Sequence, residues 1–238
     1  MIPWTLLDTA KVPDGFGELR LKRRGDEFSI MAGATELMNS RLSGSEKALA
    51  TLVCARLGAR PAPVLLIGGL GMGFTLRAAL GEVGDDARIV VAELVPAVID
   101  WARGPMAEIF GDSLSDPRVT LFEGDVARLI GEGRAAYDAI LLDVDNGPGG
   151  LTRAANDGLY SPAGLGAAWA ALRPGGVLAV WSSAPDSGFT TALRRAGFAV
   201  EEARVRAHGK SGARHVIWLA EKRVGSSSPT APRAPRRS

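Results

Sequence analysis

Cysteine and histidine are scarce in this chain of 238 residues, which contains one cysteine and two histidines. The single Cys54 has no partner for an internal disulfide, and it lies in an apolar run at residues 48–57, where a buried and unreactive thiol is expected. His208 and His215 have no cysteine or acid at ligand spacing beside them. We therefore predict no metal site, and the cysteine usage fits a reducing compartment.

Long apolar runs are missing as well. No uninterrupted stretch approaches the ~18 apolar residues that a membrane-spanning helix needs. The first residues, MIPWTLLDTAKVPDG, lack a basic segment followed by an apolar run, which is the pattern of an export signal. We therefore expect a cytoplasmic protein without a membrane partner.

A charge excess of one sign is also absent, because the formal net charge is +2. Residues 224–238 contain three arginines and no acid, so without them the rest of the chain carries a charge of −1. A nucleic-acid partner is therefore not predicted. The same segment, VGSSSPTAPRAPRRS, has few apolar groups to bury, and we expect it to be a disordered basic tail.

The remaining composition, 46% hydrophobic and 23% charged, is typical of one folded domain of ordinary size. Residues 17–37 show short strand-like segments separated by turns at residues 24–26 and 32–33, which predicts a small N-terminal β appendage within residues 1–42. Residues 45–57 have apolar side chains at helical spacing, with Ser43 or Ser45 available as the N-cap. We place the main domain at residues 43–223.

Strands and helices alternate from residue 63 onward. Strands are predicted at residues 64–67, 88–93, 119–122 and 139–143, with helices at 73–80, 96–103 and 126–130 between them. The segments VLLIGG, RIVVAE and AILLD are apolar throughout, which is typical of strands covered by helices on both faces of a parallel sheet. A helix at 162–172, a strand at 176–182, a helix at 187–196 and an antiparallel strand pair at 199–204 and 214–220 complete an α/β fold with seven strands.

A glycine-rich turn, Gly68-Gly69-Leu70-Gly71-Met72-Gly73, joins the first of these strands to its helix. Glycine lets the main chain turn sharply and approach a ligand, so Gly69, Gly71 and Gly73 are candidate binding positions. Tight packing of the helix on the sheet is an equally good explanation of such a cluster.

Acidic residues follow the next two strands. Glu93 ends the second strand 24 residues after Gly69, where a carboxylate can accept hydrogen bonds from both hydroxyls of a ribose. Asp125 follows the third strand and either receives the exocyclic amine of an adenine or caps the helix that begins at Val126. Ligands of open α/β sheets bind beyond the carboxyl ends of the strands, and all these features fall on that edge.

The fourth strand leads into Asp143-Val144-Asp145-Asn146-Gly147-Pro148. Two acids and an amide directly after a buried strand make Asp143 the best candidate for positioning or deprotonating an amine, although a turn held by Asp and Asn side chains is the alternative. Tyr160 is either an acceptor contact or a packing residue, and for Trp181 packing is the preferred interpretation.

The order of motifs in residues 63–182 resembles that of a known family. The motifs are VLLIGGLGMG, VVAELVP, LFEGDVARL, YDAILLDVDNGPGG, LYSPAGL and LRPGGVLAVW. They are similar to the spermidine synthase-like (polyamine aminopropyltransferase-like) family within the class I S-adenosylmethionine-dependent methyltransferase superfamily. The resemblance implies a Rossmann-like class I methyltransferase fold whose sheet is mostly parallel with an antiparallel last strand.

The resemblance also implies roles for individual residues. Glu93 would hold the ribose and Asp125 the adenine, the glycine turn would hold the amino-acid part of the donor, and Asp143 would contact the donor and act as catalytic base. The acceptor would be a small-molecule amine, the group donor S-adenosylmethionine or its decarboxylated form, no metal would take part, and a homodimer is left open. Acceptor contacts are expected from Glu46, Asp145, Asn146 and Tyr160.

Three positions depart from the aminopropyltransferase pattern. Gly71 and Asn146 stand where the synthases carry acids, and Ser45-Glu46 replaces a Tyr-Gln pair. These changes weaken binding of a polycationic amine, although Glu46 and Asp145 compensate in part. They favour methyl transfer, whereas the overall resemblance favours aminopropyl transfer.

Two other functions remain as alternatives. A non-catalytic nucleoside-binding or regulatory module would keep the pocket and lose the acceptor site. An NAD-dependent oxidoreductase would share the glycine turn and the acid on the ribose, but the Gly124-Asp125 and DVDNGP elements argue against it.

Overall fold

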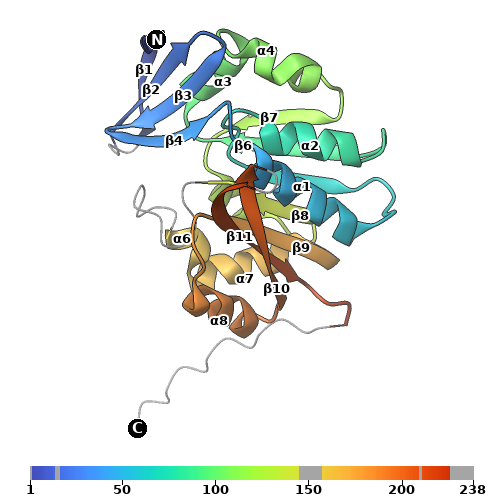
Figure 1. The fold of residues 1–238 in the computed structure, drawn as a ribbon. Helices are drawn as coiled ribbons and strands as arrows, with labels where there is room; N and C mark the ends of the chain where they lie inside the picture. The colour runs from blue at the N-terminus through green and yellow to red at the C-terminus, as the bar shows by residue number, and fades with distance from the viewer. Residues whose placement is uncertain (1, 14–16, 145–156, 209–210, 226–238) are drawn as a thin grey trace.

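The computed structural model describes residues 2–13, 17–144, 157–208 and 211–225, which form two sheets. The smaller sheet has the strand order β1-β2-β3-β4, and the larger sheet has the order β10-β11-β9-β8-β5-β6-β7. Figure 1 shows the smaller sheet at one end of the molecule, beside α3 (Pro96–Arg103). The indole Nε1–H of Trp101 in α3 donates to Asp8 Oδ2 in β1 over 2.6 Å and joins the two parts.

The N-terminal sheet is antiparallel throughout. The predicted turns at residues 24–26 and 32–33 are confirmed as the connections from β2 to β3 and from β3 to β4. The first strand was not predicted, because most of its side chains are exposed on both faces and it lacks an alternating apolar pattern. The four strands are β1 (Thr5–Lys11), β2 (Glu18–Arg24), β3 (Glu27–Ala32) and β4 (Thr35–Asn39).

The larger sheet confirms the predicted fold class. Strands β5 to β9 pair in parallel, whereas β11 is antiparallel to both β9 and β10. Because β5 lies between β6 and β8, the carboxyl ends of these strands meet at one edge of the sheet. The strands are β5 (Val64–Gly68), β6 (Arg88–Glu93), β7 (Val119–Glu123), β8 (Tyr137–Leu142), β9 (Leu172–Ser182), β10 (Ala199–His208) and β11 (Ser211–Glu221).

Helices cover both faces of this sheet (Figure 1). Along β8, Ala139 and Leu141 pack in one core cluster while Ile140 and Leu142 pack in the other, so every position of the strand is buried. This is why the strand is apolar throughout. One cluster contains α1 (Gly44–Leu57), α2 (Phe74–Glu82), α3 and α4 (Ala107–Phe110), and the other contains α5 (Val126–Glu132), α6 (Asp157–Tyr160), α7 (Pro162–Ala171) and α8 (Ser187–Arg195).

Some element boundaries differ from the prediction. Strand β9 begins at Leu172, four residues early, because Gly175 and Gly176 exchange main-chain hydrogen bonds with Lys222 despite the Pro-Gly-Gly sequence. Ser43 is the N-cap of α1 but its side chain makes no capping hydrogen bond. The short helix α4 and the 3₁₀ helix η2 (Gly111–Leu114) were not predicted.

The two sheets share one hydrophobic core, which contains Leu21 and Phe28 from the smaller sheet together with Leu65 and Val91 from the larger one. The division at residues 42 and 43 stays a prediction, and most of the expected tail lies outside the described residues. Among the helices of the described ranges, none is long and apolar enough to cross a bilayer.

Candidate functional site

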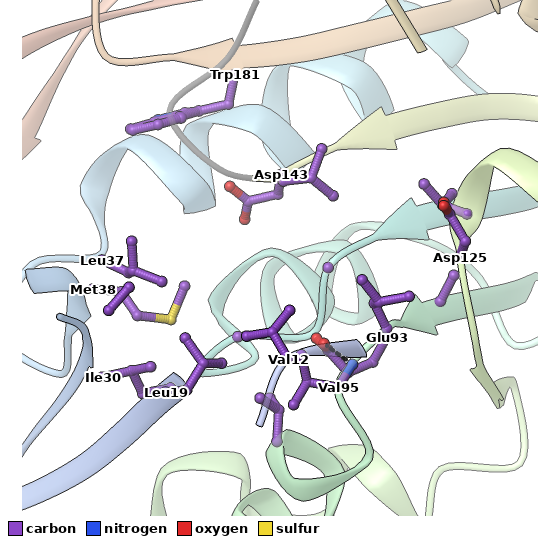
Figure 2. Close-up of a pocket in the computed structure, with 18 of the residues that line it drawn as sticks. Val12, Leu19, Ile30, Leu37, Met38, Glu93, Val95, Asp125, Asp143 and Trp181 are labelled. Atoms are coloured by element: carbon purple, nitrogen blue, oxygen red, sulfur yellow. Dashed lines mark hydrogen bonds between the residues drawn. The ribbon is translucent and has the colours of Figure 1, made fainter. Parts of the chain in front are cut away.

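A pocket of about 190 Å³ opens at the carboxyl ends of β5, β6, β7 and β8. Figure 2 shows Asp143, Asp125 and Glu93 around it, with an apolar wall from the N-terminal sheet on another side. The acidic residues that line it are Glu46, Glu93, Asp125 and Asp143, and the wall consists of Val12, Leu19, Ile30, Leu37 and Met38.

The glycine turn forms one side of the pocket through Gly69 and Gly71. Gly69 has φ +90°, and a Cβ there would lie 2.5 Å from the main-chain oxygen of Asp143. Gly71 has φ +50°, and a Cβ there would lie 2.7 Å from Cε of Met38. Gly73 instead caps α2 at φ +73°, where a Cβ would overlap the ring of Phe110. Gly73 therefore has the packing role that the sequence left open, whereas Gly69 and Gly71 line the pocket and their contact with a ligand stays a prediction.

Glu93 is 8% exposed and holds the main chain on both sides of the pocket. Its Oε2 accepts a hydrogen bond from the N–H of Leu70 and its Oε1 accepts one from the N–H of Val95, each at 2.9 Å. Burial raises the pKa of this carboxyl group, and the main-chain donors act in the opposite direction. The N–H groups of Gly71 and Leu94 also act on this carboxylate, which lines the pocket.

Asp125 caps α5, since its Oδ1 accepts a hydrogen bond of 2.8 Å from the N–H of Ala127. The capping role considered from the sequence is therefore present. Asp125 also lines the pocket, next to Gly124, whose N–H donates to the main-chain oxygen of Glu93 over 2.8 Å. Its contact with an adenine stays a prediction.

Asp143 lies one residue beyond β8, where its N–H donates to the oxygen of Gly68. Burial raises the pKa of its carboxyl group to about 7, the charge of Glu46 adds to that rise, and a hydrogen bond from Thr75 lowers it. The Thr75 hydroxyl donates to Asp143 Oδ2 over 2.6 Å. A carboxyl group with a pKa near neutrality is suited to accept a proton at physiological pH.

Glu46, in the first turn of α1, reaches the same pocket. Ser45 Oγ lies 2.7 Å from Glu46 Oε2 and 2.9 Å from His215 Nδ1. The ring of His215 packs edge-to-face against Trp181 at a centroid distance of 4.8 Å. Trp181 lines the pocket, which corrects the preference for a purely packing role.

Tyr160, another predicted acceptor residue, is not brought to this pocket. Tyr160 lies in the core cluster on the opposite face of the sheet, with its ring edge-to-face against Phe189 at 5.4 Å, so its predicted contact with an acceptor has no support. Its buried position follows from the packing of α6 against α7. Asp145 and Asn146 lie outside the described residues. Within the described ranges no group of three or more His, Cys, Asp or Glu side chains is arranged to hold a metal ion.

Sequence reasoning missed several members of the site. Thr75 and His215 stand alone in their segments, and no motif marks them. The apolar wall was also missed, since the strand pattern of the N-terminal segment does not tell which surface those side chains cover.

Comparison with known proteins gives two kinds of relative. The chain is 30% identical over 195 residues to a polyamine aminopropyltransferase of Mycobacterium tuberculosis, which covers 78% of this chain and 36% of the relative. It is 39% identical over 127 residues to putrescine N-methyltransferase 3 of Nicotiana tabacum, which covers 51% of this chain and 31% of that protein. The chain thus spans about a third of the length of these relatives. No protein-family model matches the chain.

Solved structures agree on the fold. The chain is similar to spermidine synthase from Thermotoga maritima with a TM-score of 0.73 and 19% identity, covering 92% of this chain and 73% of that one. A spermidine synthase in complex with the transition-state analogue AdoDATO gives a TM-score of 0.72, also at 19% identity and the same coverage. In its sequence and in its class I methyltransferase-like fold, the chain resembles the spermidine synthase-like family.

Proposed function

We propose that this protein transfers a methyl or aminopropyl group from an adenosyl sulfonium donor to a small-molecule amine. The observation that carries the proposal is the position of Asp143, a carboxyl group with a pKa of about 7, in one pocket with Glu93 and the glycine turn. The names of the relatives agree, since aminopropyl transfer and putrescine N-methylation both have an amine as acceptor.

The residues present fit an adenosyl group. Gly69 and Gly71 offer bare main chain, Glu93 presents a carboxylate on the pocket wall where ribose hydroxyls can reach it, and Asp125 follows the neighbouring strand β7. When bound, the donor supplies a carbon atom activated by positively charged sulfur.

The acceptor amine must present a free electron pair to that carbon, so an alkylammonium ion has to lose a proton first. Asp143 is the group placed to accept it, and Glu46 adds a second carboxylate that attracts the cation. Holding both reactants at one edge of the sheet supplies much of the remaining rate acceleration.

Within this proposal, Gly71 favours S-adenosylmethionine and methyl transfer. The decarboxylated donor ends in an ammonium group, which an acid on the glycine turn would attract, whereas S-adenosylmethionine also has a carboxylate, which such an acid would repel. Met38 covers Gly71, with its Sδ 2.9 Å from the place of a Cβ, so an acidic side chain on this turn would require the end of the Met38 side chain to move.

Titration calorimetry with S-adenosylmethionine, its decarboxylated form, methylthioadenosine and NAD tests the proposal, followed by assays of each donor with putrescine and a panel of amines. We expect nucleoside binding and an N-methylated product. Tight binding of NAD alone would indicate an oxidoreductase. Nucleoside binding without turnover on any amine would indicate a non-catalytic module.

The proposed acceptor is a small-molecule amine. Three points stay predictions from the sequence. They are that no nucleic acid is bound, that the protein is cytoplasmic, and that a homodimer is possible.

A further inference from the structure

A row of hydrogen bonds leads into the pocket from β11, and the proposed chemistry uses only its last member, Glu46. His215 Nδ1 lies 2.9 Å from Ser45 Oγ, and Ser45 Oγ lies 2.7 Å from Glu46 Oε2. His215 and Ser45 are 170 residues apart in the sequence, and Ser45 is 1% exposed. Glu46, the last side chain in this row of hydrogen bonds, lines the pocket together with Asp143.

The direction of the two hydrogen bonds follows from their chemistry. An ionised carboxylate only accepts, so the single hydroxyl proton of Ser45 is directed at Glu46. Ser45 Oγ must then accept from His215, which places the ring proton on Nδ1. Burial lowers the pKa of His215, the charge of Glu46 acts in the opposite direction, and the net shift leaves the ring neutral at neutral pH.

The ring of His215 is itself held in place. Trp181, another residue of the pocket, packs edge-to-face against it with an interplanar angle of 72°. The imidazole therefore has a defined orientation toward Ser45, and two successive hydrogen bonds strengthen one another in such an arrangement.

Glu46 and Asp143 are connected through Thr75, which is 3% exposed. Its hydroxyl lies 2.6 Å from Asp143 Oδ2 and 3.3 Å from the main-chain oxygen of Glu46. The charge of Glu46 acts on Asp143 and raises the pKa of that carboxyl group. Two carboxylates that repel each other separate unless something holds them, and a cation between them relieves the repulsion.

We propose that His215 is a positioning residue that, through Ser45, holds the carboxylate of Glu46 beside Asp143, so that these two acids together bind the ammonium group of the acceptor. This inference rests on the proposed function and identifies the acceptor end of the same pocket. The substrate class is an alkylamine that enters as a cation.

The test uses the full chain with His215→Leu, which removes the donor to Ser45, and His215→Asn, whose amide nitrogen can replace Nδ1. Ser45→Ala interrupts the same row of hydrogen bonds without changing the histidine. Arg214→Leu is the matched control, because Arg214 is an exposed neighbour on β11 that does not line the pocket. For each protein we measure the affinity for methylthioadenosine, the KM for putrescine, kcat, and the pH dependence of kcat/KM.

We expect His215→Leu and Ser45→Ala to raise the amine KM about ten-fold, the effect of losing a hydrogen bond to a charged group. Methylthioadenosine affinity stays unchanged, and His215→Asn recovers most of the loss. Because the Glu46 charge raises the pKa of Asp143, its displacement lowers that pKa, so the rising limb of kcat/KM moves to lower pH. Among the described residues, Glu46 is the charged group that acts on both Asp143 and His215.

An unchanged amine KM and pH profile in both Ser45→Ala and His215→Leu would overturn the positioning role and leave the proposed function intact. Equal losses in Arg214→Leu would also overturn it, since they would show a general effect on β11. If the wild-type protein bound no adenosyl nucleoside, the proposed function itself would fail. Should His215→Leu not fold, Ser45→Ala gives the same comparison with a smaller change in volume.

Discussion

The surroundings of Asp143 act on the ionisation of its carboxyl group in two opposite directions. Partial enclosure by β8, α2 and α1 disfavours its ionised form, and Glu46 adds like charge, whereas Thr75 stabilises the ionised form with a hydrogen bond of 2.6 Å. The result is a pKa of about 7 at the place where an amine would have to lose a proton. The same shift has a consequence for stability that is independent of any substrate.

Because the pKa of Asp143 is higher in the folded protein than in the unfolded chain, the fold binds this proton more tightly. The contribution of Asp143 to stability is therefore present below pH ~4, and it is lost as pH rises from the ordinary pKa of 3.8 to about 7. We predict that Asp143→Asn increases the free energy of unfolding relative to wild type more at pH 8 than at pH 4. Urea unfolding at both pH values measures this difference, and an equal effect at both would contradict the assigned pKa.

Among the elements, the turn between β5 and α2 depends most strongly on glycine. Gly69→Ala places a methyl group 2.5 Å from the main-chain oxygen of Asp143 and forces alanine into φ +90°. We expect a loss of stability of about 1–3 kcal/mol together with weaker nucleoside binding. Thermal unfolding and calorimetry measure the two effects.

Gly81→Ala is the control in the adjoining helix α2, because a Cβ at this exposed position has nothing within 4 Å. There we expect alanine to stabilise the helix by about 0.5–1 kcal/mol with unchanged nucleoside binding. Similar losses at Gly69 and Gly81 would contradict the assigned geometry of the turn.

Strand β8 is fixed at its other end by Asp138, whose side chain is 3% exposed. The carboxylate accepts hydrogen bonds from Arg60, Arg173 and the N–H of Val64, which join β8 to the starts of β5 and β9. Since Asp138→Ala leaves these donors without a partner, we predict a loss of about 2–3 kcal/mol in the free energy of unfolding.

Glu132→Ala provides the comparison, because the Arg128–Glu132 pair has side chains that are 67% and 64% exposed. Such a surface pair contributes little, so the change should stay within about 0.5 kcal/mol. Chemical denaturation of both variants tests the assignment, and equal effects would show that Asp138 does not join the strands as described.

For the whole molecule, the strands that could be predicted are those whose burial requires a local pattern of apolar residues in the sequence. Strands β5, β6 and β8 are continuous apolar runs because helices cover both of their faces. Glu93 and Asp143 were found because they stand at or just after the ends of such runs, whereas Asp125 was found from its place beside Gly124 after β7. Strand β1 was missed because its side chains are mostly exposed. These differences have one physical cause, since only burial imposes a periodic pattern on the sequence.

The acceptor end of the pocket was harder to predict for a related reason. His215 meets Ser45 only after β11 has paired beside β9 and α1 has packed against them, so no spacing in the sequence marks this contact. Tyr160 is the opposite case, a residue near the site in the sequence that lies away from the pocket in the fold. Its place after the fourth-strand loop suggested a role in the pocket, but its ring is buried on the opposite face of the sheet.

Single turnover of Asp143→Asn, with the adenosyl donor and the amine both saturating, is the most direct test of the central claim that Asp143 accepts the proton of the amine. We predict a rate at least about 100-fold below that of wild type, with donor affinity within a few-fold of it, because the amide keeps the shape of the side chain but cannot take up a proton. A rate equal to that of wild type would contradict the claim.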